Sequence, residues 1–312
     1  MIPVLSVLDS RDTWAEPLVA AARSRGWKAS RIFEPRDVSN VGGVAFVRPH
    51  AHPEVLPLDR IRYKMLAARD LTMVQDPTQI RVYENKRAQV HLWQDWMPET
   101  WVPATFSSAY TLISDPRTTY PLVSKSDVGA SSYNVWVLRD QVEAEAHIRQ
   151  VFLNGGIQVK HCAGGHGVAD ARSIQKDYAI LQRFIPHEVT YRVNVVGRER
   201  AIFLRRNYPD RPVAQTGNVT PVCGPLLSRE LESLLEYAET FFAAAGTRWC
   251  AIDVLRDREA GQWKLIETSL SWPWPSPGEC MAARFFPSGR RWADMWGVLL
   301  DGLEAGVWGE LV

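Results

Sequence analysis

The sequence predicts an α/β protein built from more than one structural unit. Its 312 residues exceed what a single hydrophobic core usually serves, so two or three units are expected. Short apolar strands alternate with helices in the N-terminal part, and strands recur in the C-terminal half. The composition, 46% hydrophobic and 23% charged, is typical of an ordinary globular protein.

The elements follow from apolar runs and their stop signals. Residues 3–8 predict a strand, the next helix ends near Gly26, and residues 42–49 predict a second strand after a glycine turn. Together they predict a small α/β unit that ends near residue 80. Further along we expect helices over 84–96, 140–153 and 229–245, and strands over 120–125, 134–138, 177–185, 191–196 and 201–206.

The stretch WKLIETSLSWPW, residues 263–274, closes an apolar strand with an acidic residue. A polar loop, RDREAG, precedes this strand and predicts a β-hairpin. If Leu255 faces Leu265, Asp253 lies opposite Glu267, with Cβ atoms roughly 5 Å apart. Such a pair is destabilising unless a cation lies between the carboxylates, and Mg²⁺ takes one or two carboxylates plus phosphates. We favour this metal site over an ion pair with an arginine or a register slip that separates the carboxylates.

A second motif, YPLVSKSDVGASSYNVWVL, predicts a strand, a loop of small residues and another strand. The first strand ends at Lys125, and the loop contains Gly129, Ala130, Ser131 and Ser132. Small residues let backbone N–H groups approach phosphate oxygens, and the lysine adds a fixed positive charge. The sequence contains no GxxxxGK[ST] loop, and a plain hairpin is the alternative interpretation.

Taken in order, these motifs resemble the ATP-grasp superfamily, nearest to carboxylate–amine ligases of the ribosomal-protein-S6 glutamate-adding and D-alanine–D-alanine types. The resemblance covers most of residues 80–275. ENKRAQVHLWQDWMPETWVPATF resembles the segment that carries the first nucleotide-contacting lysine, which implies Lys86. YPLVSK resembles the strand of the second lysine, which implies Lys125 on the α- and β-phosphates, followed by the loop serines Ser131 and Ser132.

The other implied site residues come from two later motifs. AILQRFIPHEVTYRVNVVG resembles the hinge strand, which implies adenine contacts from the backbone and a ribose contact from a carboxylate. Arginines after it match those that hold phosphates and the acyl-phosphate. IDVL and KLIETS match the metal-binding pair, with a serine where the family has asparagine. The implied residues are Gln182, Arg183, Ile185 and Glu188 for the nucleotide, Arg192 and Arg205 or Arg206 for catalysis, and Asp253, Glu267 and Ser269 for the metal.

The resemblance implies an ATP-grasp fold in three parts: an N-terminal α/β domain (1–83), a lid (84–185) and a C-terminal subdomain with the metal site and a Trp-rich tail (186–312). It implies an ATP-dependent carboxylate–amine ligase that uses ATP and Mg²⁺, forms an acyl-phosphate, and releases ADP and phosphate as an amide or peptide bond forms. The alternatives are an ATP-grasp phosphotransferase and a non-catalytic nucleotide-binding relative, the latter suggested by Ser269.

Expected partners are small-molecule or peptide carboxylates and amines, with a homo-oligomer left open. The net charge of +1 provides no basic footprint for nucleic acid or an anionic membrane. We find no basic signal-peptide region and no apolar run of roughly 20 residues. The four cysteines form no CxxC pair and indicate a reducing, cytoplasmic setting.

Four further motifs have competing interpretations. HCAGGHG (161–167) favours a mobile glycine loop of the lid over a zinc site, which would need more ligands. Residues 50–52, His-Ala-His, predict a solvated loop, with a substrate-facing role as the alternative. SWPWPSP (271–277) predicts a rigid extended segment packed on the large domain, or else a wall of the substrate site. The segment RWADMWGVLLDGLEAGVW predicts a docking helix through Trp292, Met295, Trp296 and Leu299.

Overall fold

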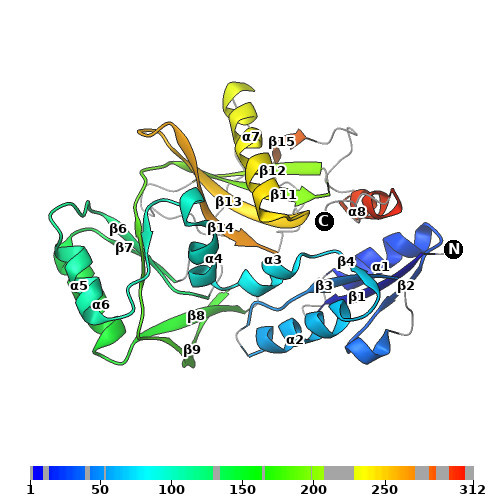
Figure 1. Cartoon of the computed structure of the whole chain (residues 1–312), viewed down its shortest axis with the longest axis horizontal. Coiled ribbons are helices and arrows are strands. Elements are labelled where there is room, and N and C mark those ends of the chain that lie inside the picture. Colours follow the sequence, from blue (N-terminus) through cyan, green and yellow to red (C-terminus); the bar gives the residue numbers. More distant parts are fainter. Residues whose placement is uncertain are drawn as a thin grey trace.

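A computed structural model describes residues 3–9, 14–38, 43–52, 54–128, 134–163, 166–197, 199–206, 228–270, 281–285 and 295–305. Within these residues, sheets of four, four and five strands form three units, and a two-stranded hairpin is separate from them. Figure 1 shows the units arranged around helix α4 (Lys86–Trp93), with the N-terminal unit and the second unit at opposite ends of the molecule.

The N-terminal unit is a parallel sheet flanked by helices. Its elements are β1 (Val4–Asp9), α1 (Ala15–Ser24), β2 (Lys28–Arg31), η1 (Pro35–Asp37), β3 (Gly43–Arg48), α2 (Leu56–Ala67) and β4 (Leu71–Met73). The strand order is β2-β1-β3-β4. The connections from β1 to β2 and from β3 to β4 run in opposite directions, so right-handed crossovers place α1 and α2 on opposite faces, as Figure 1 shows. Helix α1 is followed by Gly26 at φ +80°, the expected stop.

The second unit is an antiparallel sheet with order β5-β10-β6-β7. Helices α5 and α6 pack on it through Ile113 and Ile148, which share a core with Leu122 and Leu181. Strands β8 and β9 form the separate hairpin. The elements from the first unit onward are α3 (Pro77–Val82), α4, η2 (Gln94–Trp96), β5 (Thr100–Trp101), α5 (Phe106–Ser114), β6 (Leu122–Lys125), β7 (Val135–Leu138), α6 (Gln141–Phe152), β8 (Ile157–Ala163), β9 (His166–Gln175) and β10 (Ile180–Arg183).

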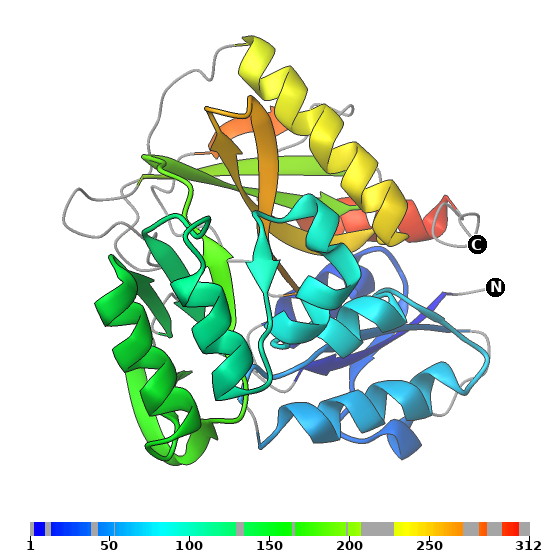
Figure 2. The ribbon, with the colours of Figure 1, turned by 60° about the vertical axis from the view of Figure 1, so that its left-hand side comes forward.

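The third unit is an antiparallel five-stranded sheet with order β14-β13-β11-β12-β15. Its elements are β11 (Val189–Val196), β12 (Glu199–Arg206), α7 (Ser228–Ala245), β13 (Trp249–Asp257), β14 (Gln262–Ser269), β15 (Met281–Phe285) and α8 (Met295–Glu304). Figure 2 shows α7 lying along this sheet. Phe241 and Leu234 of α7 contact the odd-numbered side chains of β11, such as Val193, so the even-numbered side chains face away from α7.

The predicted α/β class is confirmed, and most expected elements lie within two residues of their predicted bounds. The expected strand over 177–185 is shorter, at Ile180–Arg183. HCAGGHG, expected as a mobile loop, instead continues β8 and β9: Cys162 pairs with Gly167 and Ala163 with His166, while residues 164–165 lie outside the described part. None of the described helices combines the length and apolar character that a bilayer crossing requires.

Two helices pack outside the units that their positions in the sequence suggested. Val90 and Trp93 of α4 belong to the core of the five-stranded sheet, although the expected lid, 84–185, includes them. Trp296, Leu299 and Leu300 of α8 are buried in the core of the N-terminal unit. The docking role expected for the C-terminal helix therefore agrees with its packing. Trp292 lies outside the described residues.

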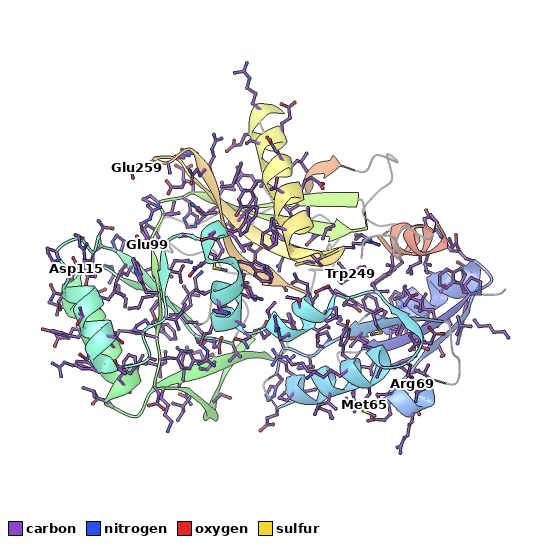
Figure 3. The ribbon with its side chains drawn as sticks, in the orientation of Figure 1. Met65, Arg69, Glu99, Asp115, Trp249 and Glu259 are labelled. Atoms are coloured by element: carbon purple, nitrogen blue, oxygen red, sulfur yellow. The ribbon has the colours of Figure 1, made fainter. Side chains whose placement is uncertain are left out.

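An aromatic cluster joins the N-terminal unit to the five-stranded sheet. The rings of Trp14, Phe46, Trp249 and Trp296 lie 5.0–6.2 Å apart, centroid to centroid. Trp249, at the start of β13, is fully buried, and Figure 3 shows it between the two units. Aromatic pairs at these separations add stabilisation beyond the area that they bury. The cluster fixes how the even-numbered face of β11 meets the N-terminal unit.

Candidate active site

The carboxylates of Asp253 and Glu267 lie opposite each other on β13 and β14, as the sequence predicts. The expected pairing of Leu255 with Leu265 is wrong, because a β-bulge between Asp253 and Val254 shifts the register. Leu265 instead faces Val254. The bulge preserves the acidic pair while both strands keep apolar side chains toward α7.

Each carboxylate has a basic partner from another element. Arg192 of β11 is the cross-strand neighbour of Asp253, with Nε 3.5 Å from Oδ1. The Lys86 Nζ lies 3.5 Å from Glu267 Oε2. The alternative of an ion pair with an arginine is thus present for Asp253, and Glu267 has a lysine partner, so the protein supplies two cations beside the proposed metal ligands. Burial, the largest single influence, would lower the pKa of Lys86, but the charges of Glu267, Glu84 and Asp127 together outweigh it and raise that pKa.

Lys125 approaches the same strand from the second unit. It ends β6, is 6% exposed, and donates from Nζ to the Ile266 carbonyl at 3.4 Å. Burial lowers the pKa of Lys125 to about 8, and the charge of Lys86 acts in the same direction, while Glu267 and Asp253 act against both. The two lysines, predicted from separate motifs, thus meet at β14 from two different units. A negatively charged ligand would favour the protonated form of both.

Lys86 is held in place by the helix that begins with it. Gln89, one turn later, accepts from the Thr268 N–H at 2.9 Å and donates to the Thr268 carbonyl at 3.1 Å. This pair of bonds fastens α4 to the edge of β14 next to Glu267. Asn85 caps the helix by accepting from the Ala88 N–H at 3.0 Å.

Asp127 connects α4 to the loop that follows β6. Its carbonyl accepts from the Lys86 N–H at 3.0 Å, and its carboxylate accepts from the Arg87 N–H at 2.8 Å. Its own N–H donates to Gln175 Oε1 at 2.7 Å. Sequence reasoning missed both Asp127 and Gln89. The available signals were an acidic residue two positions after Lys125 and an amide one helical turn after Lys86.

Comparisons with known proteins agree on one architecture. The chain is similar to the RimK domain ATP-grasp protein from Sphaerobacter thermophilus, with 20% identity, coverage of 96% of this chain and 98% of that one, and a TM-score of 0.57. It is similar to D-alanine–D-alanine ligase from Bacillus anthracis, with 11% identity, 98% and 97% coverage, and a TM-score of 0.58. It is also similar to the macrocyclase MdnC from Microcystis aeruginosa, bound with precursor peptide MdnA. The identity is 16%, the coverage is 96% of this chain and 100% of that one, and the TM-score is 0.54. The chain has the ATP-grasp fold. No protein-family model matches the sequence, and no curated protein matches it.

In the ATP-grasp fold of this chain, the residues expected to hold the nucleotide lie on β10 and just after it. Gln182 Nε2 donates to Thr100 Oγ1 at 2.8 Å. The Arg183 N–H donates to the Glu99 carbonyl at 2.8 Å, so an adenine contact from Arg183 would have to use its carbonyl. The Ile185 carbonyl accepts from His187 Nδ1 at 2.6 Å, and Glu188 is exposed just before β11.

The side chain of Arg183 links the two antiparallel sheets of the ATP-grasp fold. Its Nη2 lies 2.6 Å from Oδ2 of Asp257, a buried carboxylate at the end of β13. Burial would raise the pKa of Asp257. Hydrogen bonds from Arg183 and from the Ala260 and Glu259 N–H groups outweigh this effect and hold the pKa below its usual value.

Register separates the two candidate arginines of β12. Residue 205 pairs with Thr190, in line with Arg192, whereas residue 206 pairs with Val189 on the other face. Position 205 therefore belongs to the face that carries Asp253, although the side chains of β12 lie outside the described part. Ser131 and Ser132, and the tract 271–277, also lie outside it.

The ATP-grasp fold implies a divalent metal ion, and the described residues show which side chains could bind it. Asp253 and Glu267 supply two adjacent carboxylates, and Ser269 leaves β14 on the same face as Glu267. No group of three or more His, Cys, Asp or Glu side chains occurs among the described residues. Two carboxylates fit Mg²⁺, which takes its other ligands from water and substrate phosphates.

Proposed function

We propose that the chain is an ATP-dependent carboxylate–amine ligase. The observation that carries this proposal is the convergence of two buried lysines and one arginine on an acidic pair at β13 and β14. Lys86 and Lys125 supply positive charge for a polyphosphate. Arg192 supplies positive charge beside Asp253 and Glu267, where the reaction would take place. The described residues give this site charge and position rather than a strong base, which is what phosphoryl transfer requires.

In the proposed reaction a carboxylate oxygen of the substrate attacks the γ-phosphorus of ATP. The bond to the β-phosphate oxygen breaks, ADP leaves, and an acyl-phosphate forms. An amine then attacks the acyl carbon, phosphate leaves, the amine loses a proton, and an amide results. Arg192 would stabilise the charge on the phosphoryl group during both steps, with the arginine at position 205 on the same face.

Mg²⁺ would be held by Asp253 and Glu267, with Ser269 as a further oxygen ligand, and when bound it would neutralise phosphate charge. Lys86 and Arg192 already neutralise these carboxylates without nucleotide. We infer that Lys86 and Arg192 turn from the carboxylates to the phosphates when the nucleotide binds. Lys125 would lie on the α- and β-phosphates.

The comparisons support a peptide or small-molecule substrate in general terms. The MdnC structure is described as bound with a precursor peptide, and the Bacillus anthracis enzyme is named for joining D-alanine to D-alanine. Both resemble this chain over nearly its whole length. A cytoplasmic setting, where ATP is supplied, fits the proposal.

The test is ADP release from Mg-ATP in the presence of an acid panel, with hydroxylamine as the amine. We expect ADP release that depends on an acid and a hydroxamate product that matches it. Glu267→Gln should abolish both, whereas Glu259→Gln, an exposed carboxylate in the turn of the same hairpin (Figure 3), should change neither. ADP release with a phosphorylated hydroxyl product would indicate a phosphotransferase instead. Tight ATP binding without ADP release would indicate a non-catalytic relative.

A further inference from the structure

Asn194 is a buried amide on the sheet face that carries the candidate active site. It follows Arg192 by two residues on β11, so both side chains leave the same face of the strand. Its cross-strand neighbours are Ala201 of β12 and Ala251 of β13, and neither has a polar side-chain atom. Asn194 therefore lies one row, roughly 7 Å along the strands, from the row of Arg192, Asp253 and Glu267.

The amide of Asn194 is 0% exposed, and neither Nδ2 nor Oδ1 has a hydrogen-bond partner within the described residues. Buried amides are nearly always hydrogen-bonded, because burial removes their bonds to water. An apolar residue would fit between two alanines at no such cost. A polar side chain at this position, next to the reacting row, points to a partner that arrives with the substrate.

The molecule shows twice how a side-chain amide pairs with extended backbone. Asn134 accepts from the Lys160 N–H at 2.8 Å and donates to the Lys160 carbonyl at 2.7 Å. Gln89 pairs with the N–H and carbonyl of Thr268 in the same way. Both pairings form because the N–H and the carbonyl of one strand residue point to the same side of the strand. A carboxylate or phosphate has acceptors only, so it would leave Oδ1 of Asn194 facing another oxygen.

We infer that Asn194 binds the N–H and carbonyl of one residue in an extended peptide. The carboxylate substrate of the proposed ligase is then a peptide rather than a simple organic acid, with the recognised residue adjacent to the reacting carboxylate. This inference rests on the proposed function. Asn194 lies beside the substrate only if Arg192, Asp253 and Glu267 are the residues that carry out phosphoryl transfer.

The first arm of the test compares two buried asparagines without ligand. Leucine has as many side-chain non-hydrogen atoms as asparagine but no polar group. Asn194→Leu should keep or raise the Tm, since no hydrogen bond to another described residue is lost. Asn134→Leu should lower the Tm by several degrees, since three hydrogen bonds are lost. A fall for Asn194→Leu as large as that for Asn134→Leu would mean that its amide is paired within the chain, and would overturn the inference.

The second arm measures peptide binding by calorimetry with Mg²⁺ and a non-hydrolysable ATP analogue. The probes are acetyl-alanyl-aspartate, acetyl-alanyl-glutamate and acetyl-alanyl-alanine, each paired with a form methylated on the alanine nitrogen. At least one probe should bind about tenfold or more tightly than its methylated form, because a buried acceptor left unpaired discriminates strongly. In Asn194→Leu that ratio should fall toward one, with nucleotide affinity unchanged. Equal affinities within every pair, no binding, or a ratio that persists in the variant would overturn the inference.

ADP release separates this inference from the proposed function. If a dipeptide binds in an Asn194-dependent way without ADP release, Asn194 keeps its role and the ligase reaction is excluded. If glutarate drives ADP release as well as every dipeptide does, the ligase reaction stands and the role of Asn194 is excluded.

Discussion

Lys125 is a buried cation whose charge lowers the stability of the protein when no phosphate is bound. Its pKa falls from 10.5 to about 8 because burial disfavours the charged form. We expect Lys125→Met to stabilise the protein without nucleotide at pH 7, by about 3 kcal/mol at most, and to weaken ATP binding at least tenfold. Chemical denaturation and calorimetry measure the two effects, with the exposed Lys64→Met as control. Loss of stability in Lys125→Met would contradict this account.

The pH dependence of Lys125 has a definite sign. Between pH 8 and 10.5 the unfolded chain keeps the lysine proton while the native protein has released it. The unfolded state then binds more protons, so this residue makes the native protein more stable as pH rises through that window. The stability difference between Lys125→Met and wild type should therefore shrink above pH 8. ATP affinity of the wild type should fall over the same range, because the neutral amine attracts phosphate less.

Glu267 stabilises the ligand-free protein through Lys86. Without its charge, the buried ammonium of Lys86 loses the carboxylate at 3.5 Å, and the pKa of Lys86 should fall. We expect Glu267→Gln to lower the free energy of unfolding by about 1–2 kcal/mol at pH 7, less than for a fully buried pair because Glu267 is 29% exposed. Denaturation of Glu267→Gln, Lys86→Met and the double variant measures the coupling. Unchanged or higher stability of Glu267→Gln would show that repulsion from Asp253 dominates.

At the scale of elements, the pairing of α4 with β14 decides where Lys86 lies. Gln89→Leu removes both bonds to Thr268 and leaves a buried N–H and carbonyl unpaired. We expect a loss of about 2–3 kcal/mol in stability and a several-fold drop in ATP affinity. Gln94→Leu, an exposed amide at the end of the same helix, is the control. Normal ATP affinity in a destabilised Gln89→Leu would mean that Lys86 keeps its place without this tether.

The hairpin shows what local sequence could and could not predict. Alternating apolar residues and a polar turn were enough to predict β13, β14 and the opposition of Asp253 and Glu267. The bulge, which inserts Ile266 of β14 between the pairs Asp253–Glu267 and Val254–Leu265, was not predictable from the alternation of either strand. An arginine partner for one carboxylate was the alternative to the metal, but the sequence identified neither Arg192 nor Lys86 as a partner. They come from elements distant in sequence, and only the folded sheet brings them to β13 and β14.

At the scale of the molecule, ordered motifs predicted the fold better than they predicted the boundaries between units. The order of strands and lysines led to the ATP-grasp fold, which the structural comparisons bear out. Helix α4 begins immediately after the N-terminal unit, yet it contributes Val90 and Trp93 to the core of the five-stranded sheet. Helix α8 follows the five-stranded sheet in the sequence, yet its apolar side chains are buried in the core of the N-terminal unit. Packing between units is set by faces that become complementary only after each sheet has formed, so the chain alone gave no signal for it.

The aromatic cluster should make the N-terminal unit depend on α8. Trp296 is 6% exposed and contacts Trp14, Phe46 and Trp249. We expect Trp296→Ala to cost about 3–5 kcal/mol and to speed hydrogen exchange in β1 and β3. Leu58→Ala, at an exposed position of α2, should change neither. Unchanged exchange in β1 and β3 would show that α8 is an accessory to this core.

The same cluster has a consequence for the growing chain on the ribosome. Strands β1 and β3 leave the ribosome early, but the rings that cover Trp14 and Phe46 belong to residues 249 and 296. The core of this unit is thus completed only after both later segments have been synthesised. Until then the unit presents uncovered aromatic side chains, the kind of surface that chaperones bind and that drives aggregation.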